Sequence, residues 1–356
     1  MRRRRPVAVS FAAILWLAAG GAYGQEVPDL RPSVGEMEQV AAAPLKRKPT
    51  VDPHAPVGVR TGGIIAYPSI TVGSVVTSNV REASSGAEAA IGSRLQPALR
   101  FESDWARHSF TGQALYDRID YFDHSDLTEQ RADIFSKFRL DIRALTRAEF
   151  EAAYNLDQSG LADSDVPASA VGFRTEHRIN TAAALIHDFG PLETRLKAGA
   201  GLQIYDDVKL SGGGREDNAD RDYATPSLSL RATYTDPPML QPYVQAAYDP
   251  RYYLRKRDRD GFKRSSQGLG VSAGVVIDRG PFWSGDLAAI YLWRDYDDQA
   301  LDSNTALGLD GSLMWRPNEL TRIVLAFGTS LEDSVSTTSS SNRNWTGRID
   351  LTHGLR

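Results

Sequence analysis

Residues 192–205 read LETRLKAGAGLQIY, and side-chain polarity alternates along the whole stretch. Leu196 and Ile204 fall on one face of an extended chain and Arg195 and Lys197 on the other, because successive side chains of a β-strand point to opposite faces. Strands of soluble proteins usually have about 5–6 residues, whereas a tilted strand that crosses a membrane needs about 9–11. The length of this alternation therefore favours a membrane-spanning strand.

The same alternation extends through the chain in both directions. In residues 131–143, for example, Ile134 and Leu140 alternate with Lys137 and Arg139. The pattern predicts strands over residues 64–80, 91–102, 107–121, 131–143, 147–157, 172–186, 192–205, 222–234, 241–253, 265–277, 284–296, 304–315, 321–331 and 344–355. We therefore expect about fourteen strands, or sixteen if a C-terminal hairpin is missing, since residues 353–356 read like the approach to another short turn.

The connections between these strands alternate in length. Short ones cover residues 103–106, 144–146, 187–191, 235–240, 278–283 and 316–320. Longer, more polar ones cover residues 81–90, 122–130, 158–171, 206–221, 254–264, 297–303 and 332–343. Short turns on one rim and long loops on the other are typical of an outer-membrane barrel. The predicted fold is thus all-β, an antiparallel transmembrane up-and-down β-barrel; a soluble β-sandwich or propeller is the alternative.

The overall composition is compatible with a barrel. The chain has 41% hydrophobic and 24% charged residues, like a soluble protein, but only every second residue of a barrel strand meets lipid. The absence of cysteine excludes disulfides and thiolate chemistry. A formal net charge of −4 argues against a nucleic-acid partner.

The N-terminal part of the chain differs from the rest. Residues 2–5 are arginines, an apolar stretch follows, and residues 22–24 are small or neutral, which is the pattern of a secretory signal peptide over residues 1–24. Residues 25–57 contain six prolines and no sustained period, so we expect a disordered periplasmic arm there. The barrel would then occupy residues 58–356.

A family resemblance supports this interpretation. Residues 57–73 read VGVRTGGIIAYPSITVG and are followed by Asn79. This segment resembles the opening of the second putative β-barrel porin family. The resemblance rests on Gly58, Arg60, Gly62, Tyr67, Pro68, Ser69 and Gly73. It implies a bacterial outer-membrane barrel of a kind often associated with exopolysaccharide export.

The polar faces of the predicted strands offer candidate lumen residues. Residues 131–143 are rich in cations, residues 147–157 are rich in acids, and residues 172–186 again contain cations. The candidate lumen or selectivity residues are Arg131, Lys137, Arg139, Arg143, Glu149, Glu151, Arg174 and Arg178. One interpretation is ion pairing between strands in a wet interior. The other is a transverse field or a weak filter for a charged solute.

A basic segment follows the strand predicted over residues 241–253. Its candidate contacts for an anionic glycan or for lipopolysaccharide phosphates are Arg255, Lys256, Arg257, Arg259, Lys263 and Arg264. The alternative is a solvated loop whose like charges repel one another.

Catalysis is not expected. The six histidines are scattered, and neither a Gly-x-Ser-x-Gly elbow nor a His-Glu-x-x-His pair is present; His108, His124 and His177, which lie near acids, remain a distant enzymatic option. We expect no cofactor and no metal.

Two functions stay open. The first is a conduit for solutes or for a secreted polysaccharide, whose arm meets a periplasmic export partner. The second is a plugged structural or adhesive barrel without transport. In either case outer-membrane lipid and lipopolysaccharide are expected partners.

Overall fold

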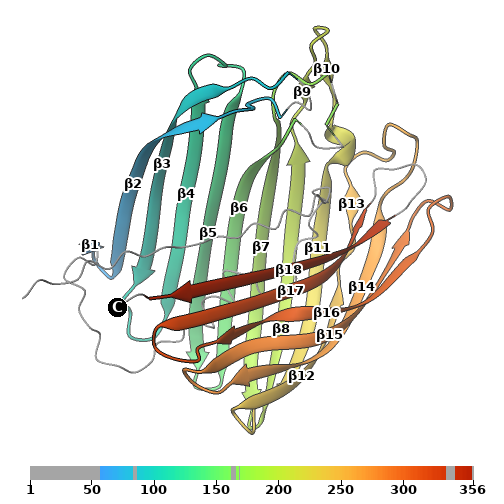
Figure 1. Cartoon of the computed structure of the whole chain (residues 1–356). Coiled ribbons are helices and arrows are strands. Elements are labelled where there is room, and N and C mark those ends of the chain that lie inside the picture. The colour runs from blue at the N-terminus through green and yellow to red at the C-terminus, as the bar shows by residue number, and fades with distance from the viewer. Residues whose placement is uncertain (1–56, 83–85, 162–165, 168, 334–340, 355–356) are drawn as a thin grey trace, which may run out of the picture.

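The computed structural model describes residues 57–82, 86–161, 166–167, 169–333 and 341–354 (Figure 1). The predicted signal peptide and periplasmic arm lie outside these residues, apart from Val57. No helix among the described residues is long and apolar enough to cross a membrane.

Long strands make up most of the described chain. They are β2 (Ile64–Thr77), β3 (Ala90–Ser103), β4 (Ser109–Tyr121), β5 (Thr128–Arg143), β6 (Thr146–Ser159), β7 (Arg174–Phe189), β8 (Leu192–Tyr205), β11 (Tyr223–Tyr234), β12 (Leu240–Tyr248), β14 (Ser266–Asp278), β15 (Trp283–Tyr296), β16 (Asn304–Trp315), β17 (Thr321–Asp333) and β18 (Ser341–His353). Each coincides with one predicted strand within a few residues at its ends. The alternation of polarity therefore located every long strand of the described residues.

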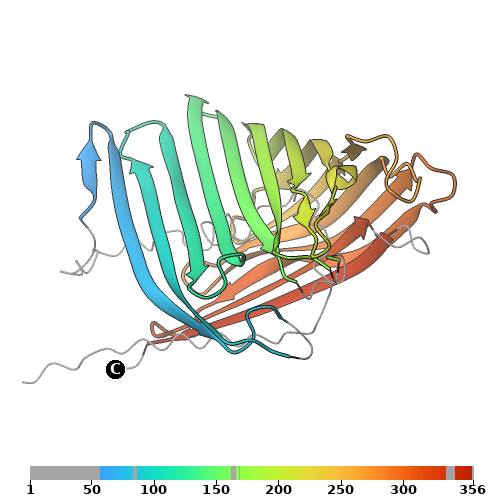
Figure 2. The same ribbon diagram turned by 90° about the horizontal axis from the view of Figure 1, so that it is seen from above.

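These strands form one antiparallel sheet in which each long strand pairs with the next one along the chain. The short strands β1 (Val59–Thr61) and β13 (Tyr252–Tyr253) bring the sheet to sixteen strands. The sheet curls strongly: β12–β18 cross in front of β4–β8 in Figure 1, and the view from above shows the two groups as opposite walls (Figure 2). The prediction of an all-β up-and-down architecture is confirmed.

Two segments differ from the prediction. The strand expected over residues 241–253 is interrupted, because β12 ends at Tyr248; beyond the break Arg251 forms a single bridge with Ser266 of β14, and Tyr252 and Tyr253 pair with β11. Pro250 lies in the interruption and cannot donate to a ladder. The loop 206–221 also contains structure that alternation does not reveal, namely the hairpin of β9 (Val208–Lys209) and β10 (Arg215–Glu216) and the 3-10 turn η1 (Ala219–Arg221).

The two faces of the sheet differ in polarity. One face leaves large apolar side chains uncovered, such as Ile70, Val72 and Val76, which are 66%, 72% and 75% exposed. Burying such side chains in water-free surroundings is favourable, and an outward apolar band is what a barrel presents to lipid. We call this the lipid face. The opposite face, which carries Lys137 and Glu149, is called the lumen face.

Candidate functional site

An ion-pair network lies at the middle of the lumen face of β5–β8. Lys137 Nζ on β5 lies 3.2 Å from a carboxylate oxygen of Glu149 and 3.0 Å from one of Glu151, both on β6. Lys197 Nζ on β8 lies 2.8 Å from Glu151, and Arg195 pairs with Glu149. Glu149 is buried although it is charged, so these cations replace the water that its carboxylate would otherwise bind.

The pairs between β8 and β6 pass over the strand that separates them. Neighbouring strands are about 4.8 Å apart, so a side chain must span about twice that distance. The residues of β7 in register with Glu149 and Glu151 are Ala184 and Ala182. Because both are small, Arg195 and Lys197 can extend across β7 without a clash. The two alanines are therefore part of the network.

The network continues toward the short turns through Arg147 on β6. Its guanidinium donates to a carboxylate oxygen of Glu193 at 2.7 Å, again across β7. It also lies 3.8 Å from Glu149. Acids and bases from β5, β6 and β8 thus face one another, which leaves little net charge in this part of the wall.

The other candidate lumen residues on β5 and β7 also have neighbours of opposite charge or polar partners. Arg131 pairs with Asp133 at 3.0 Å and Arg139 with Asp141 at 2.8 Å. Arg178 donates to Glu176 at 3.1 Å, whereas Arg174 is buried, donates to Ser159 Oγ at 2.9 Å and lies 5.3 Å above the ring of Tyr205.

Arg143 does not lie among the charged residues of the lumen face. A β-bulge between Asp141 and Arg143 shifts the register against β6, so that Arg143 pairs with Thr146. Thr146 in turn contacts His187, away from the lumen row. Arg143 is exposed beside the short turn, outside the cluster formed by Lys137 and Glu149.

The opposite wall carries a polar cluster on β11, β12 and β15. Arg231 on β11 donates to Asp286 on β15 at 2.8 Å, and its guanidinium lies 3.4 Å from the ring centroid of Tyr243 on β12, whose hydroxyl also donates to Asp286. Gly274 on β14 makes this possible, because a Cβ there would collide with the Tyr243 ring. The remaining lumen face of this wall is mostly small residues, including Ala247, Gly270, Ser272, Ala288, Ala306, Gly308 and Ser312.

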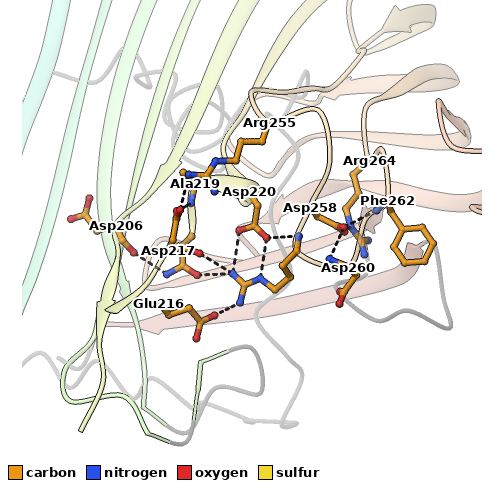
Figure 3. A network of polar contacts seen from close by, with 12 residues as sticks. Asp206, Glu216, Asp217, Ala219, Asp220, Arg255, Asp258, Asp260, Phe262 and Arg264 are labelled. Atoms are coloured by element: carbon orange, nitrogen blue, oxygen red, sulfur yellow. Dashed lines mark hydrogen bonds and ion pairs between the residues drawn. The ribbon is translucent and has the colours of Figure 1, made fainter. Parts of the chain in front are cut away.

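The basic segment 254–264 is tied to acids of the neighbouring loop (Figure 3). Arg259 donates through Nε to Asp220 Oδ2 at 2.9 Å and through Nη2 to Asp220 Oδ1 at 3.1 Å. Its guanidinium also contacts Asn218 Oδ1 at 3.2 Å and pairs with Glu216. A planar fork of donors suits such multiple contacts.

Two further candidate cations of this segment are also paired. Arg255 donates to Asp217 at 2.7 Å, and Arg264 pairs with Asp258. Lys256, Arg257 and Lys263 form no ion pair within 4 Å among the described residues, although Arg257 donates to the Gly261 carbonyl. Lys256 and Lys263 are therefore the cations of the segment most available to an external anion.

Electrostatics of the loop acids reflect these contacts. Burial acts to raise the pKa of Asp220, but the hydrogen bonds and charge of Arg259 outweigh it and hold the pKa below its usual value. The backbone N–H of Ala219 and the guanidinium of Arg255 likewise lower the pKa of Asp217. Asp222, in contrast, has a raised pKa because burial dominates there. We call these joined segments, residues 206–222 and 251–264, the loop staple.

A second contact brings another long loop onto the lumen face. Val80, Ala90, Tyr121 and Leu127 form a buried cluster at the long-loop ends of β2–β5. Leu161 and Phe173, from the connection between β6 and β7, pack against it. Tyr121 is in register with Gly92, two residues from the lumen residue Arg94. Leu161 and Phe173 therefore lie against the inner surface of the first strands.

The structure does not bring the three candidate histidines together. Near a short turn, His108 Nδ1 accepts a hydrogen bond from the backbone N–H of Asp141. His124, in a long loop, lies 3.8 Å from Glu88. His177, on β7, lies 3.5 Å from Asp206. The described residues also contain no group of three His, Asp or Glu side chains suited to a metal ion.

Sequence reasoning missed several residues of the lumen wall. Arg195, Lys197 and Glu193 lie on the polar face of the stretch that decided the fold, but alternation does not show which acids they meet. Arg231 and Asp286 were missed because the registers of three successive strand pairs, β11–β12, β12–β14 and β14–β15, decide that they approach each other. The sequence offered one signal for these contacts: Arg195 and Lys197 are two residues apart, and so are Glu149 and Glu151.

Comparison with known proteins places the chain in a family. Residues 52–356 match the family described as Putative beta-barrel porin 2, and the chain belongs to this family of porin-like barrels of the bacterial outer membrane. No curated protein matches the chain.

Solved structures resemble the chain at low identity and low TM-score. The chain is similar to a bacterial polysaccharide outer membrane secretin, with 8% identity, a TM-score of 0.45, and coverage of 82% of this chain and 91% of that one. The siderophore receptor PirA from Pseudomonas aeruginosa gives 11% identity and a TM-score of 0.42; the match covers 77% of this chain but only 44% of the receptor. OmpF of Salmonella typhi gives 11% identity, a TM-score of 0.33, and coverage of 84% and 100%.

Proposed function

We propose that this protein is a weakly selective conduit across the outer membrane. The observation that carries the proposal is the lumen face itself, which is polar along β3–β8 and lined by small residues on β12–β16. Barrels of about eight strands are filled by their own side chains, whereas barrels of about sixteen leave a water channel. The fourteen long strands among the described residues come close to the second class.

The charge pattern supports weak selectivity. Lys137, Glu149 and Glu151 pair among themselves and with cations of β8, so their fields cancel over short distances. A hydrated ion pair contributes little net field beyond about 10 Å at physiological salt. Neutral or zwitterionic hydrophilic solutes therefore fit this wall better than a strongly charged one.

A secreted polysaccharide is one substrate class within this proposal. It rests on the resemblance of residues 57–73 to exopolysaccharide-associated barrels and on the hydroxyl and amide groups of the lumen face. The role of residues 25–57 as a contact for a periplasmic partner belongs to the same proposal. The protein acts without catalysis in this account.

A plugged structural barrel is the second candidate. It is favoured by the packing of Leu161 and Phe173 over the lumen ends of β2–β5 and by the loop staple around Arg259. Both features narrow the long-loop mouth if they persist in the membrane.

Single-channel recording separates the two candidates. The refolded protein in a planar bilayer should give stable conductance steps, and a neutral polysaccharide added to one side should reduce them if that polymer enters. Silence from protein that migrates as a folded, heat-modifiable barrel would contradict the conduit and favour the plugged barrel.

A further inference from the structure

The ladder between β16 and β17 stops halfway along both strands. Among the described residues it pairs Gly311–Trp315 with Ile323–Phe327. β16 nevertheless continues to Asn304 in register with β15, and β17 continues to Asp333 in register with β18. The two strands are thus joined by a backbone ladder at the short-turn end, which we call the zipped half. Toward the long loops the described ladder does not continue.

The ladder ends at a level of the sheet where two glycines flank Phe327. Gly311 on β16, Phe327 on β17 and Gly347 on β18 are in register. Gly311 has φ +151°, and a Cβ at this position would collide with the backbone carbonyl of Asp286. Only glycine adopts this backbone without strain. The glycine at position 311 therefore fixes the point along β16 at which the strands part.

Side chains take over the role of the missing ladder. The hydroxyl of Thr329 accepts a hydrogen bond from the Leu309 N–H at 3.2 Å and donates one to the Leu309 carbonyl at 3.0 Å. Arg343 on β18 donates to the Thr305 carbonyl at 2.9 Å. Thr329 is 1% exposed and fills the space beside Gly308, where a Cβ would collide with it. We call this region, bounded by residues 304–310 and 328–331, the seam.

Apolar side chains border the seam on both faces. Leu292 and Ala306 pair on the lumen face, and Ala306 is buried. Leu307 and Leu309 project to the lipid face, where they are 69% and 54% exposed. Leu331, two residues beyond Thr329, is buried. Apolar side chains therefore line the seam from the lumen wall to the lipid, beside the polar residues Asp310 and Ser330.

We propose that the seam is a lateral port that passes an amphipathic molecule with an alkyl chain between the lumen and the outer leaflet. Hydrocarbon disfavours a strand edge whose backbone groups lack partners, so edges in contact with lipid are normally avoided. Here the side chains of Thr329 and Arg343 supply partners for Leu309 and for the Thr305 carbonyl, and these side chains can swing away without unravelling a ladder. The inference rests on the barrel and goes beyond axial conduction.

Thiol labelling tests the port, because the chain has no cysteine of its own. Leu331→Cys reports on the seam, and Met314→Cys, also buried but in the zipped half of β16, is the matched control. Each is reconstituted in phosphatidylcholine vesicles that contain a long-chain N-alkylmaleimide. Thr329→Val, which removes the hydroxyl, should speed labelling at residue 331 by about tenfold or more, as expected for two lost hydrogen bonds. Thr329→Ser should leave the rate unchanged.

The port is contradicted if Thr329→Val and Thr329→Ser label residue 331 at the same rate, or if residue 314 responds equally. Should Thr329→Val fail to give a heat-modifiable band, Arg343→Met removes the bond to Thr305 and must have the same effect. Conductance recorded on the same samples keeps the two proposals separate. Conductance without labelling contradicts the port alone, and labelling without conductance contradicts the conduit alone.

Discussion

At the scale of single residues, Glu149 is the centre of the charged wall. Cations from three strands approach it: Lys137 from β5, Arg147 from its own strand β6, and Arg195 from β8. Its position was predictable from alternation, since Glu149 lies on the polar side of residues 147–157. The identity of its partner Arg195 was not, because alternation gives the face of a strand but not its register with a strand two positions away.

Glu149→Gln should make the channel more selective for anions. The substitution removes one acid from among three cations and keeps the side-chain volume. The variant is compared with wild type by reversal potential in a KCl gradient. Asp120→Asn is the control, because Asp120 pairs with Arg118 on the face of Leu95, toward lipid. An equal shift in both variants would contradict the assignment of Glu149 to the lumen.

Arg259→Lys should loosen the loop staple although the charge is kept. A lysine ammonium cannot reproduce the fork that contacts Asp220, Asn218 and Glu216. Hydrogen exchange of the backbone in residues 251–264 should accelerate, with protection reduced by about 1–3 kcal/mol for the lost charge-assisted bonds. Lys256→Gln, on the same loop, should leave exchange unchanged; a similar loss of protection there would point to general loop disorder instead.

At the scale of elements, alternation predicted the strands well and their irregularities poorly. β8 coincides with the stretch 192–205 because every second residue along it meets lipid. The break between β12 and β13, the bulge before Arg143 and the early end of the β16–β17 ladder escaped prediction. These features depend on how neighbouring strands pair, and the local period of one strand carries no information about that.

Ala184→Leu should destabilise the barrel through the network that crosses β7. The larger side chain would fill the space over which Arg195 and Lys197 reach β6, at a cost of about 1–3 kcal/mol for overpacking. The next residue offers a matched control, since Ala183 lies on the opposite face in register with Phe150 and Ala198. Urea unfolding in detergent followed by tryptophan fluorescence compares the two. Equal destabilisation by Ala183→Leu would contradict the crossing.

Acid should open the loop staple. Asp217 and Asp220 have lowered pKa values in the folded loops, so their contribution is fully present above the ordinary aspartate pKa of 3.8 and is lost as pH falls below it. Asp222, whose pKa is raised, acts in the opposite direction and is relieved by acid. The protection factors of residues 206–222 against hydrogen exchange, which correct for the intrinsic exchange rate at each pH, should stay high from neutral pH to about pH 4 and fall below it. Loosening that begins near pH 7 would contradict the roles of Asp217 and Asp220.

At the scale of the whole molecule, the account depends on one division of the sheet into a lipid face and a lumen face. The division follows from a period of two, explains why a chain with 24% charged residues belongs to a membrane-protein family, and places the ion pairs inside. It was predictable from sequence because lipid imposes polarity on every strand alike. Loop contacts, such as those of Arg259, follow no such common rule.

Two adjacent residues of β8 provide the most direct test. In the cysteine-free chain, Leu196→Cys and Lys197→Cys each carry one environment-sensitive fluorophore, and the protein is reconstituted in bilayers. The account predicts that lipid-borne quenchers reach the fluorophore at 196 and that water-soluble quenchers reach the one at 197. Equal access of both quenchers to both positions, or the reverse pattern, would contradict the division of the sheet and the barrel interior built on it.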